Sequence, residues 1–160
     1  MKKTALALAY SLLLLTACDS GSMDDLSAGG SGSNAGGGAA SIIGTTPSGQ
    51  DVTDRVFFAF DSSVVDSEGQ GVLQRQAEWL KANGNVNITL EGHADERGTR
   101  EYNIGLGERR AEAAKNYLVN QGVAAGRIST ISYGKERPAV TGNEESAWSQ
   151  NRRAVTVSAD

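Results

Sequence analysis

The chain has 160 residues, of which 39% are apolar, and a formal net charge of −4. This length suits one ordinary globular domain with additional segments. The mild acidity argues against nucleic-acid binding, which normally needs a basic patch and a high isoelectric point. Cys18 is the only cysteine, so an intrachain disulfide is excluded. One cysteine and one histidine also leave few ligands for zinc, which prefers about four.

The N-terminus has the pattern of a targeting segment. Lys2 and Lys3 precede an apolar run over residues 4–15 that is too short to cross a bilayer. The run ends in LTAC, Leu15 to Cys18, which resembles the lipobox of bacterial lipoproteins. This resemblance implies that residues 1–17 are a signal peptide and that Cys18 is lipidated, which would anchor the chain to a membrane. A plain secretory signal followed by a chance cysteine is the alternative.

Residues 18–50 are predicted to be the lipidated cysteine followed by a flexible tether. Half of residues 19–50 are Gly or Ser, and such a segment cannot bury enough apolar area to offset its ordering entropy. As a flexible coil it would reach about 30 Å. Asp19 directly follows the cysteine, and in enteric bacteria an aspartate there is a signal for retention in the inner membrane. The anchor is therefore better defined than the membrane that receives it.

Periodic patterns begin at Asp51 and predict seven elements in alternating order. Apolar and β-branched runs predict strands, apolar residues on one face predict helices, and Gly84 and Gly122 suit helix C-termini. The predicted strands span residues 52–60, 86–91, 128–133 and 154–158, and the predicted helices span residues 67–83, 101–121 and 144–151. This β-α-β-α-β-α-β order predicts an α/β two-layer sandwich over residues 51–160, with the helices on one side of a small mixed sheet.

The loop EGHADERGTREYN, residues 91–103, joins the second predicted strand to the long helix. Thr99 is a suitable N-cap, and a loop that enters a helix N-terminus is a common position for a ligand. On the helix, Arg110 shares a stripe with small and apolar residues, so we expect it on the buried face. A buried guanidinium needs a partner, and Asp95 is the local candidate. Two interpretations remain open: a structural Asp95–Arg110 ion pair, or a pocket in which the two charges hold a zwitterion.

His93 raises the question of a metal site or a catalytic centre. His93, Asp95 and Glu96 resemble metal ligands, but the chain has no second histidine. A hydrolase would need His93 as its base, and no G-x-S-x-G motif accompanies it. We therefore expect no cofactor, no metal and no catalysis. His93 is expected to be a structural residue at a strand end, hydrogen-bonded to the loop.

The segment EGHADERGTREYNIGLGERRA, residues 91–111, closely resembles the signature of OmpA-like peptidoglycan-binding domains. The pattern N-x-x-L-(small)-x-x-R-A is present from Asn103 to Ala111. The segments SYGKERPAV, residues 132–140, and NRRAVTV, residues 151–157, are also similar to the family. The resemblance covers residues 51–160 and includes the arrangement of lipobox, tether and domain.

The resemblance implies non-covalent binding of the diaminopimelate residue in the peptidoglycan stem peptide. The family's key aspartate and arginine fall on Asp95 and Arg110, which would hold the charged groups of that side chain. The other residues that the resemblance places in the site are Glu96, Arg97, Thr99, Asn103, Leu106, Phe60 and Asp61. Arg152 and Arg153 are interpreted as structural support of the loop or as a solvated pair.

The resemblance also implies a place in the cell and a second partner. The folded domain would lie in the periplasm and anchor the outer membrane to the cell wall, although Asp19 leaves the inner membrane possible. The Tol envelope system would supply a periplasmic propeller protein, TolB, that binds the same face as peptidoglycan, with roles in envelope integrity and cell division. The alternative function is a lipid-anchored protein–protein adaptor with weak or no wall binding.

Overall fold

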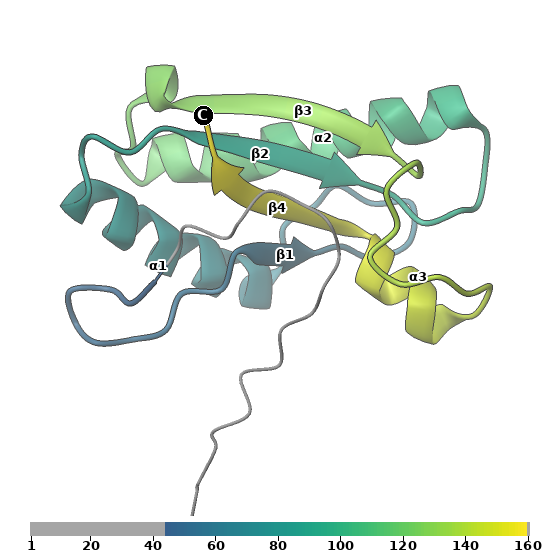
Figure 1. The fold of residues 1–160 in the computed structure, drawn as a ribbon, viewed down its shortest axis with the longest axis horizontal. Coiled ribbons are helices and arrows are strands. Elements are labelled where there is room, and N and C mark those ends of the chain that lie inside the picture. Colours follow the sequence, from purple (N-terminus) through teal and green to yellow (C-terminus); the bar gives the residue numbers. More distant parts are fainter. Residues whose placement is uncertain (1–43, 160) are drawn as a thin grey trace, which may run out of the picture. The chain divides into compact units, whose positions relative to one another are not determined.

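The computed structural model describes residues 44–159, so the predicted signal peptide and Cys18 lie outside the described residues, as does most of the tether. The elements follow the predicted alternation of strands and helices (Figure 1). They are β1 (Arg55–Phe57), α1 (Ser67–Ala82), β2 (Ile88–His93), α2 (Arg100–Asn120), β3 (Ile128–Gly134), α3 (Glu145–Asn151) and β4 (Arg153–Ser158), with a short 3₁₀ turn at Ala125–Arg127 before β3.

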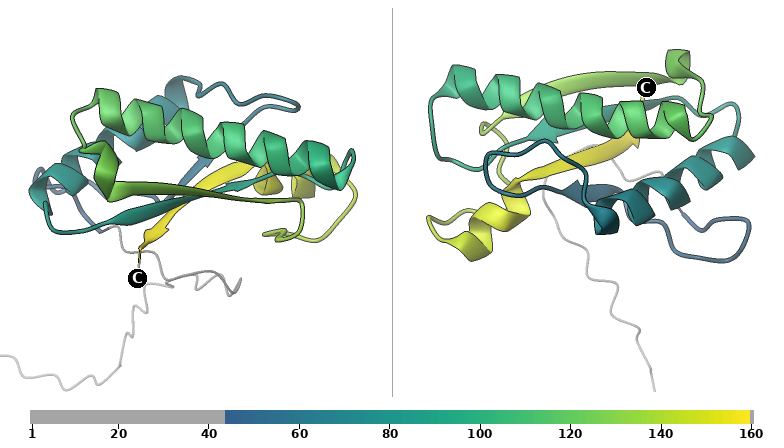
Figure 2. Two further views of the ribbon diagram at one scale, coloured as in Figure 1. Left: turned by 90° about the horizontal axis from the view of Figure 1, so that it is seen from above. Right: turned by 180° about the vertical axis from the view of Figure 1, so that it is seen from behind.

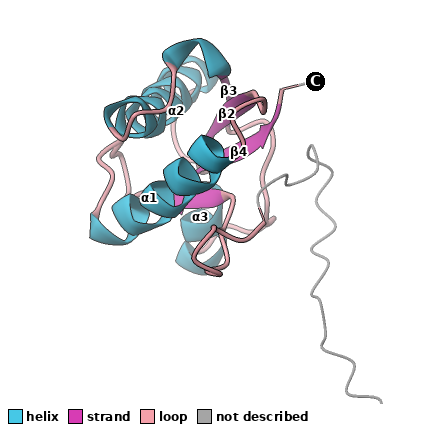
Figure 3. Ribbon diagram, turned by 90° about the vertical axis from the view of Figure 1, so that its left-hand side faces the viewer, coloured by secondary structure: helices cyan, strands magenta, loops and turns pink. Residues whose placement is uncertain are grey.

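The four strands form one mixed sheet in the order β1-β4-β2-β3. β4 pairs antiparallel with both β1 and β2, whereas β2 and β3 are parallel and are joined through α2. α1 and α2 cover the same face of this sheet (Figures 2 and 3). α3 lies beyond the end of the sheet where β2 ends and β4 begins (Figure 1). The predicted α/β two-layer sandwich is confirmed, with α3 outside the helical layer.

The core lies between the sheet and the two long helices. Its members are apolar residues from α1, α2 and the inward faces of the strands, together with Phe58 and Val123 from connecting segments. The most deeply buried of them are Leu73, Leu80, Ile88, Leu90, Ala111, Ala114 and Leu118. Among residues 44–159, no helix is long and apolar enough to cross a membrane.

The element boundaries differ from the predicted ones at the first strand. β1 is shorter than predicted because the chain leaves the sheet at Phe58, whose N–H donates to the Arg152 carbonyl, and then turns. Asp61 in that turn has a left-handed backbone, with φ of 53°. The residues predicted to end the strand, Phe60 and Asp61, therefore belong to the β1–α1 loop.

The two long helices end in different ways. α2 ends as predicted, because Gly122 is left-handed at φ of 94° and the N–H groups of Gly122 and Val123 bond back to Val119 and Leu118. α1 ends without a left-handed glycine. There Arg127 donates to the carbonyls of Leu80, Asn83 and Val86, so a distant side chain satisfies the helix C-terminus.

A close contact between two glycines fixes α2 against the sheet. A Cβ added to Gly92 in β2 would lie 1.9 Å from the Gly107 carbonyl oxygen, and a Cβ added to Gly107 would lie 2.4 Å from Ser132 Oγ. Neither position can hold a side chain unless the backbones separate. The N-terminal half of α2 is thereby held beside the end of β2, where the loop of residues 94–99 begins.

The outer face of the sheet carries a buried charged cluster around His93. His93 and Glu91 alternate with the core residue Leu90, so they lie on the face opposite the helices. His93 lies at a strand end as predicted, but neither ring nitrogen makes a hydrogen bond to the loop of residues 94–99. The predicted hydrogen bond to the loop is therefore wrong. Burial, reinforced by the positive charges of Arg153 and Arg137, lowers the pKa of His93 to about 3.

We expect Gly107→Ala to destabilise the domain by about 3 kcal/mol, because overpacking of a close contact forces backbone shifts. Gly105→Ala, in the same helix, is the matched control. A Cβ there would meet only the flexible end of Arg109 at 3.4 Å, so the change should stabilise the helix by about 1 kcal/mol. Chemical denaturation measures both, and equal effects of the two substitutions would contradict the proposed close contact.

The pH dependence of stability should reveal the buried neutral His93. Between pH 6.5 and about 3, the unfolded chain binds a proton at this residue and the folded chain does not. The free energy of unfolding therefore decreases as the pH is lowered through this window, by up to about 1.4 kcal/mol per pH unit from this group. Burial raises the pKa of Glu91, whose contribution has the opposite sign.

The measurement is the difference in free energy of unfolding between the natural chain and His93→Phe at several pH values from 7 to 4. Groups far from His93 titrate alike in both chains, so this difference reports on His93 and its neighbour Glu91, whose Oε2 lies 3.7 Å from the His93 Nε2. As the pH is lowered, we expect the natural chain to lose more free energy of unfolding than His93→Phe does. A difference that does not change with pH would mean that His93 is not held neutral.

Candidate functional site

The candidate site is a pocket at the end of the sheet where β2 ends. Its cavity volume is about 160 Å³. The β1–α1 loop, the β2–α2 loop and the first turns of α2 supply its walls. The lining residues are Phe60, Asp61, Asp95, Arg97, Gly98, Tyr102, Asn103 and Leu106. Six predicted site residues thus meet in one cavity, whereas Glu96, Thr99 and Arg110 do not line it.

Asp95 is the buried acid of the pocket, with 5% of its surface exposed. Its Oδ1 accepts hydrogen bonds from the backbone N–H and Nε of Arg97, both at 3.1 Å. Its Oδ2 accepts from Arg97 Nη2 at 2.7 Å and lies 3.5 Å from Arg152 Nη1. Burial alone would raise the pKa of Asp95, but the hydrogen bonds and charge of Arg97, with the charge of Arg152, lower it. Asp95 is therefore a carboxylate at neutral pH.

The side chain of Arg97 lies between two aromatic rings at the rim of the pocket. Its guanidinium carbon is 4.0 Å from the ring centre of Phe60 and 4.0 Å from that of Trp148. Phe60 comes from the β1–α1 loop and Trp148 from α3. The Trp148 ring is fixed because its Nε1 donates to Glu96 Oε1 at 3.1 Å. Glu96 therefore does not line the pocket, but its carboxylate is hydrogen-bonded to Trp148, an aromatic neighbour of Arg97.

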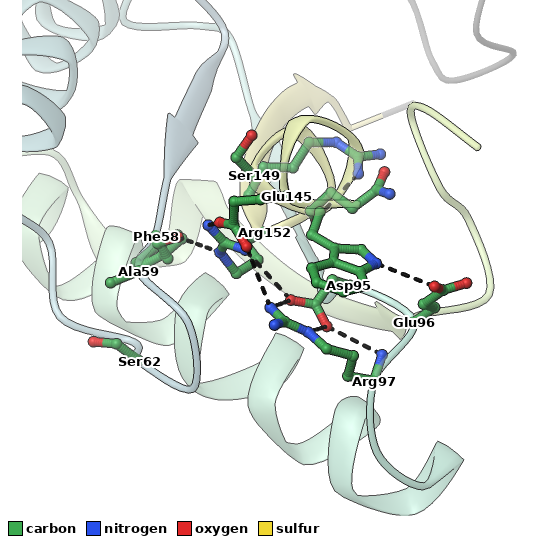
Figure 4. A network of polar contacts seen from close by, with 12 residues as sticks. Phe58, Ala59, Ser62, Asp95, Glu96, Arg97, Glu145, Ser149 and Arg152 are labelled. Carbon is green, nitrogen blue, oxygen red and sulfur yellow. Dashed lines mark hydrogen bonds and ion pairs between the residues drawn. The ribbon is translucent and has the colours of Figure 1, made fainter. Parts of the chain in front are cut away.

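Arg152 is the second cation beside Asp95, on the other side of the carboxylate from Arg97 (Figure 4). Its Nε donates to the Phe58 carbonyl at 2.9 Å and its Nη2 to Glu145 Oε1 at 2.5 Å. Only 7% of its surface is exposed. Arg153 is equally buried and donates to the carbonyls of Asn151 and Arg137. Arg152 supports the loop through Asp95, as interpreted, whereas Arg153 bonds to carbonyls outside that loop. The alternative of a solvated pair is wrong, because both side chains are buried.

Arg110 is fully buried beneath the pocket. Its Nε donates to the Ser62 carbonyl, its Nη1 to the His93 carbonyl and its Nη2 to the Ala59 carbonyl, at 2.8, 2.8 and 3.1 Å. Burial lowers its pKa to about 10, so it remains a cation at neutral pH. The expectation that Arg110 lies on the buried face is confirmed.

The structural Asp95–Arg110 ion pair is not formed. The ion-pair partners of Asp95 within the described residues are Arg97 and Arg152. Backbone carbonyls satisfy Arg110 instead. The physical reason is that Ala59 and Ser62 in the β1–α1 loop, and His93 at the end of β2, present their oxygens to its guanidinium, which removes its need for a carboxylate.

The first turn of α2 completes the pocket wall. Thr99 is the N-cap as predicted, because its Oγ1 accepts from the Tyr102 N–H. Asn103 is buried and its Nδ2 donates to the Arg97 carbonyl at 2.8 Å, which ties the loop to the helix. Leu106, also buried, adds the apolar part of the lining.

Sequence reasoning missed Tyr102 and Gly98. The Tyr102 hydroxyl donates to the Asp61 carboxylate, and this hydrogen bond raises the pKa of Tyr102. Its position one turn before Leu106 on the same helical face was the available signal. Gly98, with φ of 91°, allows the turn that leads into the helix.

The arrangement can hold a small ligand that carries both charges. Asp95 and Asp61 are its acids, Arg97 lies at its rim and Arg110 lies beneath it. His93 lies outside the lining. Within residues 44–159, no three histidine, cysteine or acidic side chains form a group that could hold a metal ion. The geometry therefore supports recognition of a charged group.

Known relatives carry the same domain. Residues 57–152 match the OmpA family. The peptidoglycan-associated lipoprotein of Agrobacterium fabrum is 58% identical over 106 residues, which cover 66% of this chain and 60% of that protein. The protein of the same name from Mesorhizobium japonicum is 56% identical over 117 residues, which cover 71% and 70%. The chain thus spans about 60% of the length of the first relative.

Solved structures agree with the sequence relatives. The peptidoglycan-associated lipoprotein of Burkholderia pseudomallei has a TM-score of 0.65 at 42% identity, over 67% of this chain and 91% of that chain. The C-terminal domain of Helicobacter pylori MotB has a TM-score of 0.61 at 20% identity, over 66% and 82%, and shows the fold alone. The resemblance found in residues 91–111 is confirmed, and the chain belongs to the OmpA family.

Proposed function

We propose that the domain binds peptidoglycan non-covalently, through the diaminopimelate residue of the stem peptide. The observation that carries this proposal is the small pocket around the buried carboxylate of Asp95, with arginines at its rim and beneath it. The end of a diaminopimelate side chain bears an ammonium and a carboxylate on one carbon. The names of the relatives, which associate those proteins with peptidoglycan, support the same ligand.

In this proposal the Asp95 carboxylate accepts hydrogen bonds from the ligand's ammonium. Arg110 contributes a positive charge below the pocket, and its hydrogen bonds hold the two loops that form the walls. A guanidinium has five N–H donors and Arg110 uses three for these carbonyls. A ligand carboxylate could reach the other two only if the β1–α1 loop moved, because Arg110 has no exposed surface.

The rest of the chain suits an envelope anchor. We propose that Cys18 carries lipid, that residues 19–50 act as a tether, and that the protein links the outer membrane to the cell wall within the Tol–Pal system. TolB is the proposed protein partner, and it would bind the same face of the domain that binds peptidoglycan. The aspartate at position 19 keeps inner-membrane retention as the alternative address.

A second candidate function is that of a protein–protein adaptor. Two large side chains of the pocket lining are exposed, with 60% of Phe60 and 48% of Tyr102 accessible. Val64, in the same loop as Phe60, is 74% exposed. Exposed apolar groups close together suit a protein partner. An adaptor of this kind would keep its protein partner after a substitution that removes the pocket charge, whereas a wall binder would lose its ligand.

The deciding measurement is calorimetric titration with a stem peptide that contains diaminopimelate, beside the same peptide that contains lysine. We expect the natural chain to bind the first and reject the second, and Asp95→Asn to weaken binding at least tenfold. Removal of one partner of a desolvated charge pair typically costs about 2–5 kcal/mol.

Glu78→Gln on α1, away from the pocket lining, is the control and should bind normally. Thermal unfolding of each variant separates lost binding from lost fold. Equal binding of both peptides, or of neither, would favour the adaptor.

The lipid anchor has its own test. We expect Cys18→Ser to move the protein from the membrane fraction to the soluble periplasmic fraction, because lipid chains supply about 0.8 kcal/mol of membrane binding per buried CH₂. Mass spectrometry of the natural protein should show the added acyl mass on a chain that begins at Cys18. Retention of the variant in the membrane fraction, or an unmodified cysteine, would contradict the anchor.

A further inference from the structure

The acceptor proposed for the ligand is already occupied by an internal cation. Both oxygens of Asp95 receive hydrogen bonds from the Arg97 side chain. An ammonium cannot take up this position while the guanidinium remains there. A cationic ligand that takes the position of this guanidinium at Asp95 must therefore compete with Arg97.

The contacts of Arg97 permit its side chain to leave while Asp95 stays in place. The Arg97 side chain is 31% exposed, so outward movement does not disrupt the core. The backbone N–H of Arg97 would still donate to Asp95 Oδ1, and Arg152 would still face Oδ2. Asn103 also holds the Arg97 carbonyl, which fixes the backbone of the loop. The carboxylate would thus keep its orientation for an incoming ammonium.

Two aromatic rings contact the Arg97 guanidinium at the pocket entrance while it is paired with Asp95. Its guanidinium carbon lies 4.0 Å from the ring centre of Phe60 and 4.0 Å from that of Trp148. A guanidinium that contacts aromatic rings through its faces retains its in-plane N–H donors for an anion. A carboxylate attached to the same carbon as the ammonium would arrive beside these donors.

We propose that Arg97 is the residue that selects a zwitterionic ligand end over a simple amine. The ligand's ammonium displaces Arg97 from Asp95, and the ligand's carboxylate then pairs with the freed guanidinium. A simple amine can take Asp95 only by leaving Arg97 without an anion. This inference rests on the proposed function, because it concerns the same pocket.

The test is selectivity, measured as the ratio of dissociation constants for the lysine and diaminopimelate peptides. In Arg97→Gln the internal competitor and the carboxylate partner are both absent. We expect the lysine peptide to bind several-fold more tightly than to the natural chain, and the ratio to fall at least fivefold. Arg100→Gln is the matched control, because Arg100 is a nearby exposed arginine that pairs with Glu136 and does not line the pocket. Its ratio should stay within twofold of the natural value.

The other outcomes have distinct meanings. Weaker binding of both peptides by Arg97→Gln, at an unchanged ratio, would make Arg97 a permanent support of Asp95 and overturn the inference. A weaker diaminopimelate complex with unchanged lysine binding would show a ligand contact without competition and also overturn it. A fall of the ratio in Arg100→Gln would assign the effect to net charge. Failure of the natural chain to bind either peptide would instead remove the proposed function itself.

Fluorescence supplies a readout that does not depend on the stability of Arg97→Gln. The chain has two tryptophans, so Trp79→Phe leaves Trp148 as the only reporter, with the Arg97 guanidinium on its face. We expect the diaminopimelate peptide to change Trp148 emission as Arg97 shifts, at the same concentrations that titrate by calorimetry. Binding without any change in emission would show that Arg97 stays in place and would overturn the displacement.

Discussion

The pocket depends on the burial of one guanidinium, that of Arg110. An unpaired buried charge would cost several kcal/mol, and this cost is avoided because three backbone carbonyls surround it. Two of those carbonyls belong to the β1–α1 loop and one to the end of β2. The two loops that form the pocket walls are therefore fixed to α2 and to each other by a single side chain. The close contact between Gly92 and Gly107 packs α2 against β2 and so brings the Arg110 guanidinium within reach of these carbonyls.

Three arginines with different degrees of burial surround the site. Arg110 is fully buried and holds backbone, and Arg152 is nearly buried and links Asp95 to Glu145 and the Phe58 carbonyl. Arg97 is partly exposed and contacts Asp95 through its side chain. Displacement becomes easier as exposure increases, because fewer buried partners lose their hydrogen bonds. In the proposed exchange, Arg110 and Arg152 therefore remain in place and Arg97 is the cation that the ligand replaces.

Much of the fold could be predicted because its signals are local. The strand and helix order, the Thr99 cap and the Gly122 C-terminus all follow from residues near each other in sequence. Of the two interpretations left open for Asp95 and Arg110, the ion pair is wrong, because side-chain types do not reveal where backbone carbonyls point. The same limit applies to Arg127, whose partners are the carbonyls at the end of α1. Six of the residues that the family resemblance placed in the site line the pocket. Tyr102 could have been added from helical spacing alone.

The size of the pocket sets what kind of attachment it can provide. A cavity of about 160 Å³ holds the end of one side chain, so each contact with a ligand must come from a few charged groups. If the ligand displaces Arg97, the loss of the Asp95–Arg97 pair offsets part of the Coulomb gain at Asp95, which would limit affinity while it increases selectivity. A lipid anchor and tether would compensate, since confinement near the wall raises the effective ligand concentration without new contacts. Modest affinity per pocket is then consistent with a firm link between membrane and wall, made by many tethered copies.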